Sequence, residues 1–423
     1  MTKYFRSAKF ARRSLIVPVI VGASGLWAMP AQAQQTAAPA VVTPAFDFSG
    51  VIFGSYSIRT DSAGKASLGG NSPNAFNLDR AYLTFKMPAG ENGQIRITTD
   101  VYQNTNTAQN GYYQGWAIRL KYAYAQYTAL KNNFGAGSSL VGRLGILHTV
   151  LLDHEENFWP RYLAPTGPDR NNFFPSADAG IAGLLTLGDK LGEVYGTVTN
   201  GPGYGSYEKD RFKDFALRVS LTPLANSKDM NAIVKTFTIS PWVYKGYVGS
   251  SFAGGGAGQI GPGTNGAVTD AMTRDRYGLF AGLRDRRLTA GAEWAQRSDE
   301  SEKGANTAAA PRIVNDSSGR LLDGFIVARP MELFDASQKS NVSLIARFDH
   351  YTPNTSPSSA NYAGSTPSYN YWVLGASYDV TQRITLALDW QKQTGVSFPD
   401  PNGTNLRAAP DNSNVFLHFQ AIF

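Results

Sequence analysis

The residues best suited to chemistry are concentrated in one segment, from Val150 to Asp178, where charged and aromatic side chains are interspersed. Opposite charges on two sides of a narrow aqueous space create a field that orients water and polar solutes. A segment this rich in aromatic residues would be costly in water, so we expect it to pack against the rest of the chain and to present its charges to a lumen. The charged candidates are Asp153, Glu155, Glu156, Arg161, Asp169 and Arg170.

A second set of charges, nearly all of them basic, precedes this segment. They occupy alternate positions in stretches where charged and apolar residues alternate, so they would share one face of each stretch, together with Asp100. The alternative is that they form ion pairs along a wall without selecting any solute, because opposite charges on neighbouring strands often pair for stability. The predicted basic ladder consists of Arg80, Lys86, Arg96, Arg119, Lys121 and Arg143.

Sixteen alternating segments would position these side chains. A period of two predicts β-strands, and an even number of antiparallel strands is what a single-chain barrel in a bacterial outer membrane requires. The segments cover residues 46–59, 76–87, 94–103, 115–128, 140–149, 179–187, 191–200, 213–222, 234–247, 273–283, 287–297, 321–329, 341–351, 370–379, 382–393 and 412–423.

The phase of the alternation predicts which face meets lipid and which meets water. In the second segment, Leu83 and Phe85 alternate with Arg80 and Lys86. A soluble β-sandwich would show the same period, so the alternation alone does not distinguish the two architectures. In the fourth segment, the residues expected to face lipid are Trp116, Ile118, Leu120, Tyr122 and Tyr124.

The connections between the segments alternate in length. The odd-numbered connections are long, whereas several even-numbered ones are short, such as 88–93 and 188–190. Long extracellular loops alternating with short periplasmic turns are typical of outer-membrane barrels, and about sixteen strands enclose an aqueous channel. We therefore expect one all-β, transmembrane antiparallel β-barrel domain over 46–423, with an inward-folded third loop at 150–178.

Residues 1–33 have the pattern of a cleaved signal peptide. Five basic residues and no acid precede an apolar run that begins at Leu15, and Ala31-Gln32-Ala33 is an A-x-A cleavage site. The alternative of a retained membrane helix is weakened by the shortness of the run and by Pro18 within it. An N-terminal spacer rich in Ala, Pro and Gln would then cover 34–45.

Removal of the signal peptide changes the charge of the chain. The 39 basic and 32 acidic residues become 34 and 32, because five of the basic residues precede the cleavage site. A net charge of +2 gives no reason to expect nucleic acid as a partner. The chain has no Cys, so an exported protein would not depend on disulfides.

The last strand ends on an aromatic residue, Phe423. Phe419 and Phe423 share its apolar face, and His418 and Gln420 lie on the other. Terminal residues of soluble domains usually fray, whereas this ending resembles the signal read by the barrel-assembly machinery of Gram-negative bacteria. We expect Phe419 and Phe423 to form a C-terminal assembly signal, and the last strand to pair with the first. The alternative is a soluble β-rich domain that ends on a core strand.

Catalysis and metal binding have few candidates. The four histidines are His148, His154, His350 and His418, and Phe158 stands where an H-E-x-x-H motif from His154 would need its second histidine. None of the four belongs to a G-x-S-x-G elbow. We expect no catalytic residue, no metal site and no cofactor.

Three stretches resemble the phosphate-selective porin O and P family. Leu78 to Lys86 is similar to the first hairpin of that family, as is Arg119 to Tyr127 further on, and Phe158 to Tyr162 is similar to loops of related porins. The resemblance implies a sixteen-stranded trimeric channel with an arginine ladder for anions and lysines at the constriction.

The chain departs from that family in the segment 150–178, which has no Lys and begins with an acidic cluster. We therefore expect an outer-membrane porin for ions and small hydrophilic solutes, weakly anion-selective, rather than a phosphate channel. Its expected partners are outer-membrane lipid, lipopolysaccharide, the barrel-assembly machinery and further copies in a homotrimer. The alternatives are an outer-membrane enzyme and a binding or adhesion barrel with a plugged lumen.

Overall fold

The fold is known from a computed structural model that describes residues 46–103, 115–206, 208, 210–249, 271–303, 313–355, 368–395 and 411–423. The predicted signal peptide and spacer, residues 1–45, lie outside the described residues. No helix among the described residues is both long and apolar enough to cross a membrane.

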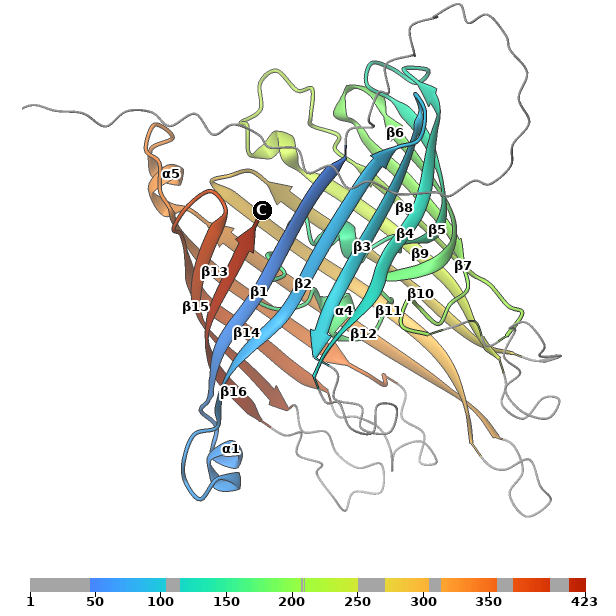
Figure 1. The fold of residues 1–423 in the computed structure, drawn as a ribbon. Helices are drawn as coiled ribbons and strands as arrows, with labels where there is room; N and C mark the ends of the chain where they lie inside the picture. The colour runs from blue at the N-terminus through green and yellow to red at the C-terminus, as the bar shows by residue number, and fades with distance from the viewer. Residues whose placement is uncertain are drawn as a thin grey trace, which may run out of the picture. The chain divides into compact units, whose positions relative to one another are not determined.

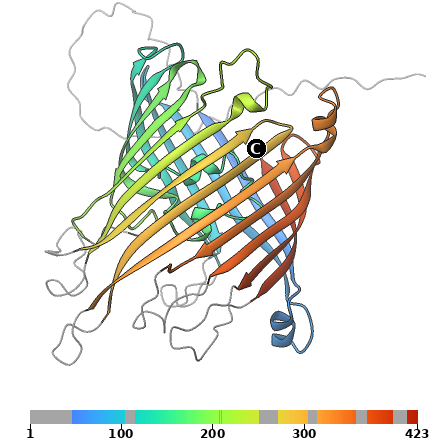
Figure 2. The ribbon, with the colours of Figure 1, turned by 180° about the vertical axis from the view of Figure 1, so that it is seen from behind.

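The described residues form a closed barrel of sixteen antiparallel strands (Figure 1). Each strand pairs with its neighbours in sequence, and the reverse view shows the wall made by the yellow to orange strands (Figure 2). The predicted fold class and strand number are therefore confirmed. The strands are β1 Asp47–Arg59, β2 Asn74–Pro88, β3 Gly93–Gln103, β4 Trp116–Lys131, β5 Ser139–His148, β6 Ala177–Leu187, β7 Gly192–Thr199, β8 Asp214–Leu221, β9 Thr238–Gly249, β10 Ala271–Arg284, β11 Leu288–Lys303, β12 Ile313–Ala328, β13 Val342–Thr352, β14 Tyr369–Asp379, β15 Ile384–Gly395 and β16 Asn412–Ile422.

Short helices lie in the connections of the described chain. The first long connection holds α1, and the third holds both α3 and α4. Two turns at the other end are tight, 285–287 between β10 and β11 and 380–383 between β14 and β15, whereas β8–β9 and β12–β13 have longer connections. The helices are α1 Ser62–Ser67, α3 Leu152–Glu155, α4 Gly167–Arg170, α5 Pro330–Phe334, and the 3₁₀ turns η1 Gly188–Lys190 and η2 Val234–Thr236.

The hairpin of β11 and β12 is longer than predicted. The strands pair as far as Lys303 and Ile313, whereas the sequence prediction ended them at 297 and 321. The added residues are mostly polar on both faces, so the alternation stops although the backbone pairing continues. Polar side chains also bond across this hairpin, as in the hydrogen bond of 3.0 Å from the hydroxyl of Ser298 to the carboxylate of Asp316.

The predicted faces hold for most strands, but β4 changes phase at a β-bulge. Thr98 pairs with Tyr122 and Thr99 with Leu120, so Lys121 is the extra residue. A bulge places two successive side chains on the same side of a strand. Tyr122 and Tyr124 are therefore buried on the inner face, at 4% and 5% exposure. Their predicted lipid-facing position is wrong, while Ile118 and Leu120 are exposed as predicted.

The barrel closes where β1 meets β16, as the sequence predicts. Gly50 and Phe423 exchange backbone hydrogen bonds of 2.9 and 3.0 Å. Phe423 covers Gly50 so closely that a β-carbon there would lie 2.3 Å from its ring, and Phe419 covers Gly54 in the same way at 2.2 Å. Both rings lie against glycine backbone, which lets the last strand sit flat on the first.

Gly180 and Gly183 of β6 form a matched pair for testing how closely β6 and β7 approach. A β-carbon at Gly180 would lie 2.1 Å from the carbonyl oxygen of Val198, whereas nothing lies within 4 Å of one at Gly183. We expect Gly180→Val to lower the free energy of unfolding by about 1–3 kcal/mol, the usual cost of overpacking. Gly183→Val should change it by less than about 0.5 kcal/mol. Urea titrations in detergent, followed by tryptophan fluorescence, measure both values, and equal midpoints would contradict the predicted difference.

Candidate functional site

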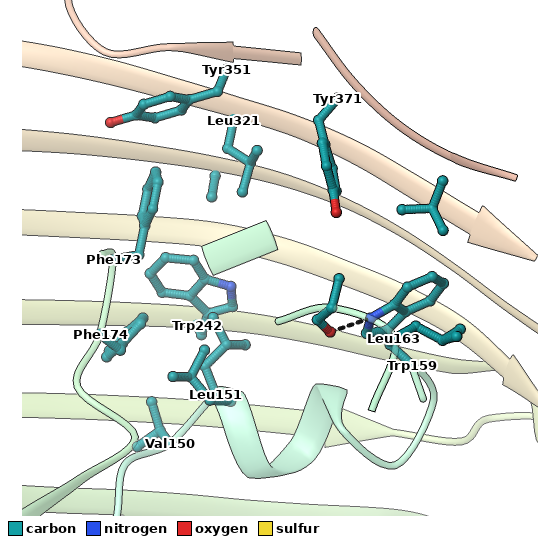
Figure 3. Close-up of a cluster of buried hydrophobic side chains, with 14 of the residues drawn as sticks. Val150, Leu151, Trp159, Leu163, Phe173, Phe174, Trp242, Leu321, Tyr351 and Tyr371 are labelled. Carbon is teal, nitrogen blue, oxygen red and sulfur yellow. Dashed lines mark hydrogen bonds between the residues drawn. The ribbon is translucent and has the colours of Figure 1, made fainter. Parts of the chain in front are cut away.

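The connection between β5 and β6, residues 149–176, packs against the inner wall of the barrel (Figure 3). We call it the lumenal loop. The aromatic rings of the loop pack among aromatic rings of the wall. Trp159 is 1% exposed and its ring centre lies 5.3 Å from that of Phe325, and the ring centre of Phe174 lies 5.1 Å from that of Trp242. The burial of these aromatic surfaces stabilises the folded-in position of the loop.

Polar side chains of the same wall bind the backbone of the lumenal loop. Arg347 of β13 donates to the carbonyl of Pro165 at 2.6 Å and its guanidinium lies 4.8 Å from the ring centre of Trp159. Buried carbonyl groups need such partners, so these bonds fix the path of the loop. Further bonds run from Arg218 to Val150 at 2.6 Å, from Gln391 to Leu163 at 3.0 Å, from Arg276 to Asn172 at 3.1 Å and to Phe173, and from Arg297 to Asn171 at 3.1 Å.

Two of the six predicted loop charges contact the wall that holds the loop. Glu155 is 2% exposed and lies beside Glu293 of β11. Burial, together with the charge of Glu293, raises the pKa of Glu155 well above its ordinary value. Arg170 lies 3.6 Å from the ring centre of Tyr371 and donates to Gln393 at 2.7 Å. These contacts attach the loop and do not bring the two charges to the cavities described below.

The other four predicted loop charges lie together on its opposite side. Arg161 is 2.5 Å from Glu156 and 2.6 Å from Asp169. Asp153 lies 3.4 Å from His148, and about half of its side chain, 52%, is exposed. Because three carboxylates accompany one guanidinium, this side of the lumenal loop is acidic.

Two of the predicted basic residues are paired on the facing wall. Arg119 and Arg80 share the buried carboxylate of Asp100, at 2.9 and 3.6 Å. Arg119 also lies between the rings of Tyr102 and Tyr204, 4.2 and 4.4 Å from their centres. For these two arginines, the geometry fits the alternative of a structural ion pair.

The remaining basic residues have no carboxylate within ion-pair distance in the part of the chain that the structure describes. Lys86 stands in register with Arg96 on the neighbouring strand. The other three lie against rings, where cation–π attraction partly replaces an ion pair. Arg96 is 4.8 Å from the ring centre of Tyr122, Lys121 is 4.3 Å from that of Tyr82, and Arg143 is 5.4 Å from that of Tyr124.

Two cavities lie between the lumenal loop and the wall of β1–β4 and β16. The first, of about 280 Å³, and the second, of about 210 Å³, share Phe53 and Arg161 and are therefore adjacent. The extra residues of two bulges contribute a charge to each, Lys121 to the first and Asp79 of β2 to the second. The charged residues that line them are Arg80, Arg96, Lys121 and Arg161 against Asp79, Asp153 and Glu156.

One histidine–serine pair satisfies the distance criterion for a nucleophile and its base, but not the access criterion. His154 lies 3.0 Å from the hydroxyl of Ser240, which is 0% exposed. Burial lowers the pKa of His154 well below its ordinary value. Among the described residues, no group of three or more His, Asp or Glu side chains is arranged to hold a metal.

Sequence reasoning missed the arginines that anchor the loop and the inward position of Tyr122 at the first cavity. The anchoring arginines lie on β8, β10, β11 and β13 at inward positions, so the alternation that revealed Arg80 and Lys86 would also have revealed them. The ring of Tyr122 was hidden because aromatic residues suit either face of a barrel strand, and the bulge at Lys121 inverts the expected phase of β4. Tyr82, in contrast, shares the predicted inward face with Arg80 and Lys86.

The sequence has no recognised relatives, whereas the fold does. No protein-family model matches the sequence, and no curated protein sequence matches it. The resemblance to the phosphate-selective porin O and P family therefore has no support from a family model.

The barrel is similar to solved outer-membrane proteins. It matches the outer membrane channel DcaP of Acinetobacter baumannii with a TM-score of 0.59 and 10% identity over 90% of this chain and 97% of that chain. It matches an anion-selective porin from Comamonas acidovorans with a TM-score of 0.54 and 11% identity over 90% of this chain and 100% of that chain. It matches OmpF of Salmonella typhi in complex with daunomycin with a TM-score of 0.53 and 12% identity over 89% of this chain and 97% of that chain. At these identities the likeness shows a shared fold, that of a closed outer-membrane β-barrel.

The raised pKa of Glu155 predicts a pH-dependent stability that Glu155→Gln removes. As the pH rises above about 4.3, an unfolded chain releases the proton of this residue before the folded barrel does, so the wild type loses stability relative to the variant as the pH rises. Each pKa unit of the shift corresponds to about 1.4 kcal/mol. Urea midpoints of both proteins at pH 5 and pH 8 measure the difference. If the difference in urea midpoint between the two proteins is no larger at pH 8 than at pH 5, Glu155 is not held protonated in the folded barrel.

Proposed function

We propose that the chain is an outer-membrane porin, a water-filled channel for the passive diffusion of ions and small hydrophilic solutes. The observation that carries this proposal is the pair of charge-lined cavities between the lumenal loop and the facing wall of a closed barrel. Large apolar side chains such as Ile118 and Leu144 are exposed on the outside, at 70% and 65%, as a lipid-facing wall requires.

The charges around the cavities act as a constriction. The acidic side of the lumenal loop faces the basic residues of β2–β4, so a field crosses the passage and orients dipolar solutes. Four basic residues against three acidic ones line the two cavities, which supports a weak preference for anions. A phosphate-specific ladder is less well supported, because Arg80 and Arg119 share Asp100.

The cellular setting follows from the same proposal. Residues 1–33 would direct export and be cleaved, and the barrel would lie among outer-membrane lipid and lipopolysaccharide after the barrel-assembly machinery reads Phe419 and Phe423. A homotrimer is proposed by analogy, since one similar structure is a trimer form of OmpT, an outer membrane protein of Vibrio cholerae, with a TM-score of 0.51 and 8% identity over 90% of this chain and 99% of that chain. The proposal includes no enzymatic activity, because the one short His–Ser contact found among the described residues is closed to solutes.

Purified protein should give stepwise conductance in planar bilayers, with a reversal potential in a KCl gradient that indicates weak anion preference. Arg96→Gln should shift the ion permeability ratio toward cations by about fivefold, because a unit charge at ~4 Å contributes about 1 kcal/mol even in water. Arg287→Gln serves as the control, since Arg287 pairs with Asp285 in the turn after β10. Bilayers that stay silent would exclude the porin function, and an unmoved reversal potential for Arg96→Gln would exclude its role.

The proposed assembly signal makes a separate prediction. Phe423→Ala removes the ring that covers Gly50 and lies 5.8 Å from Phe48, so the amount of folded barrel in the outer membrane should fall several-fold. Phe76→Ala, which removes an outer ring that is 87% exposed, is the matched control. The measurement is the heat-modifiable band in gels of membrane fractions. If both variants accumulate like the wild type, Phe423 has no role in assembly.

A further inference from the structure

The first lumenal cavity has opposite charges on its two sides. Arg96 and Lys121 line its wall side, and Asp153 and Glu156 line its loop side. A solute with one charge complements only one of these sides, whereas a solute with both charges complements both. The cavity therefore favours a dipolar occupant over a simple ion.

The cationic side lacks a carboxylate of its own. Lys121 is 3% exposed, and its ammonium lies over the ring of Tyr82. Arg96 donates to the hydroxyl of Thr98 at 3.1 Å and lies 3.3 Å from Nε2 of His148, and neither partner is a carboxylate. A carboxylate that entered the cavity would supply a charged acceptor to both, in the strongest class of protein hydrogen bond.

The acidic side is short of one cation. Arg161 serves both Glu156 and Asp169, so its charge is shared between two carboxylates. Asp153 keeps 52% of its side chain exposed, beside His148. An ammonium group placed between Asp153 and Glu156 would balance the excess of negative charge on this side.

Aromatic surface connects the two charged sides. Phe53, Tyr82, Tyr122 and Trp159 all contribute to the lining of the cavity. Its volume of about 280 Å³ suits a small solute. Rings of this kind stabilise an aromatic occupant through burial and through offset or edge-to-face contacts.

These contacts carry an inference that rests on the proposed pore. We infer that the first cavity is a binding subsite for small zwitterions with an aromatic side chain, the chemistry of a free aromatic amino acid. The carboxylate of the solute binds Arg96 and Lys121, its ammonium group binds Asp153 and Glu156, and its ring packs against Phe53.

Four probes of related structure test this subsite on the unaltered protein. Phenylalanine carries both charges and a ring, N-acetylphenylalanine lacks the positive charge, phenylalanine amide lacks the negative charge, and glycine lacks the ring. Single-channel recording in KCl measures the concentration at which each probe interrupts the current. Phenylalanine should act at a concentration about tenfold lower than N-acetylphenylalanine and phenylalanine amide, because one charged contact is worth at least a factor of about ten. It should also act at a concentration about tenfold lower than glycine, because glycine buries no ring.

Two variants separate the two charged sides. Lys121→Met should weaken the effect of phenylalanine about tenfold and leave that of phenylalanine amide unchanged. Asp153→Asn should weaken phenylalanine to the same extent and leave N-acetylphenylalanine unchanged. Lys392→Met is the matched control, since Lys392 lies on the same outer face of β15 as the exposed Leu386 and Leu388.

The outcomes distinguish the inference from the function on which it rests. Channels that conduct KCl but respond equally to all four probes overturn the subsite and leave the porin function intact. Interruption by N-acetylphenylalanine as strong as that by phenylalanine makes the cavity an anion site and also overturns the inference. Silent bilayers overturn both proposals.

Discussion

The position of the lumenal loop depends on buried guanidinium groups of the wall, of which that of Arg347 is one. It makes two hydrogen bonds of 2.7 Å with Asp349, one of 2.6 Å with the carbonyl of Pro165, and a stacking contact with Trp159. A buried charge is costly unless it is paired and fully hydrogen-bonded. Asp349 offsets the charge, but the last acceptor and the apolar cover come from the loop. The loop therefore supplies an acceptor that Arg347 needs, and Arg347 supplies a donor that the buried carbonyl of Pro165 needs.

This attachment decides where solutes can pass. Because the lumenal loop occupies the inner face of β8–β15, the free space lies between the loop and the opposite wall. The side of the loop that faces this space is acidic, while the wall across from it carries the basic residues. The field across the passage is thus a result of which wall holds the loop, and the aromatic packing on one side creates the polar gap on the other.

The sequence predicts the strands well because a membrane barrel forces alternation on every one of them. The number of strands, the closure at Phe423 and the inward positions of Arg96 and Arg143 all follow from that constraint. The prediction of strand ends fails where this constraint is relaxed, as in the polar ends of β11 and β12, whose pairing continues to Lys303 and Ile313. Contacts between distant segments, such as Arg347 with Pro165, could not be predicted, because alternation gives the face of a side chain but not its partner across the lumen.

The bulges at Asp79 and Lys121 allow a strand of the wall to gain or lose one residue. In a regular strand, adding or removing one residue turns every later side chain to the opposite face. At a bulge the extra residue stands outside the ladder, so a chain without Lys121 would keep Leu120 outside and Tyr122 inside. One charge of the first cavity can therefore be gained or lost through a single codon insertion or deletion, without exposing a lumenal side chain to lipid.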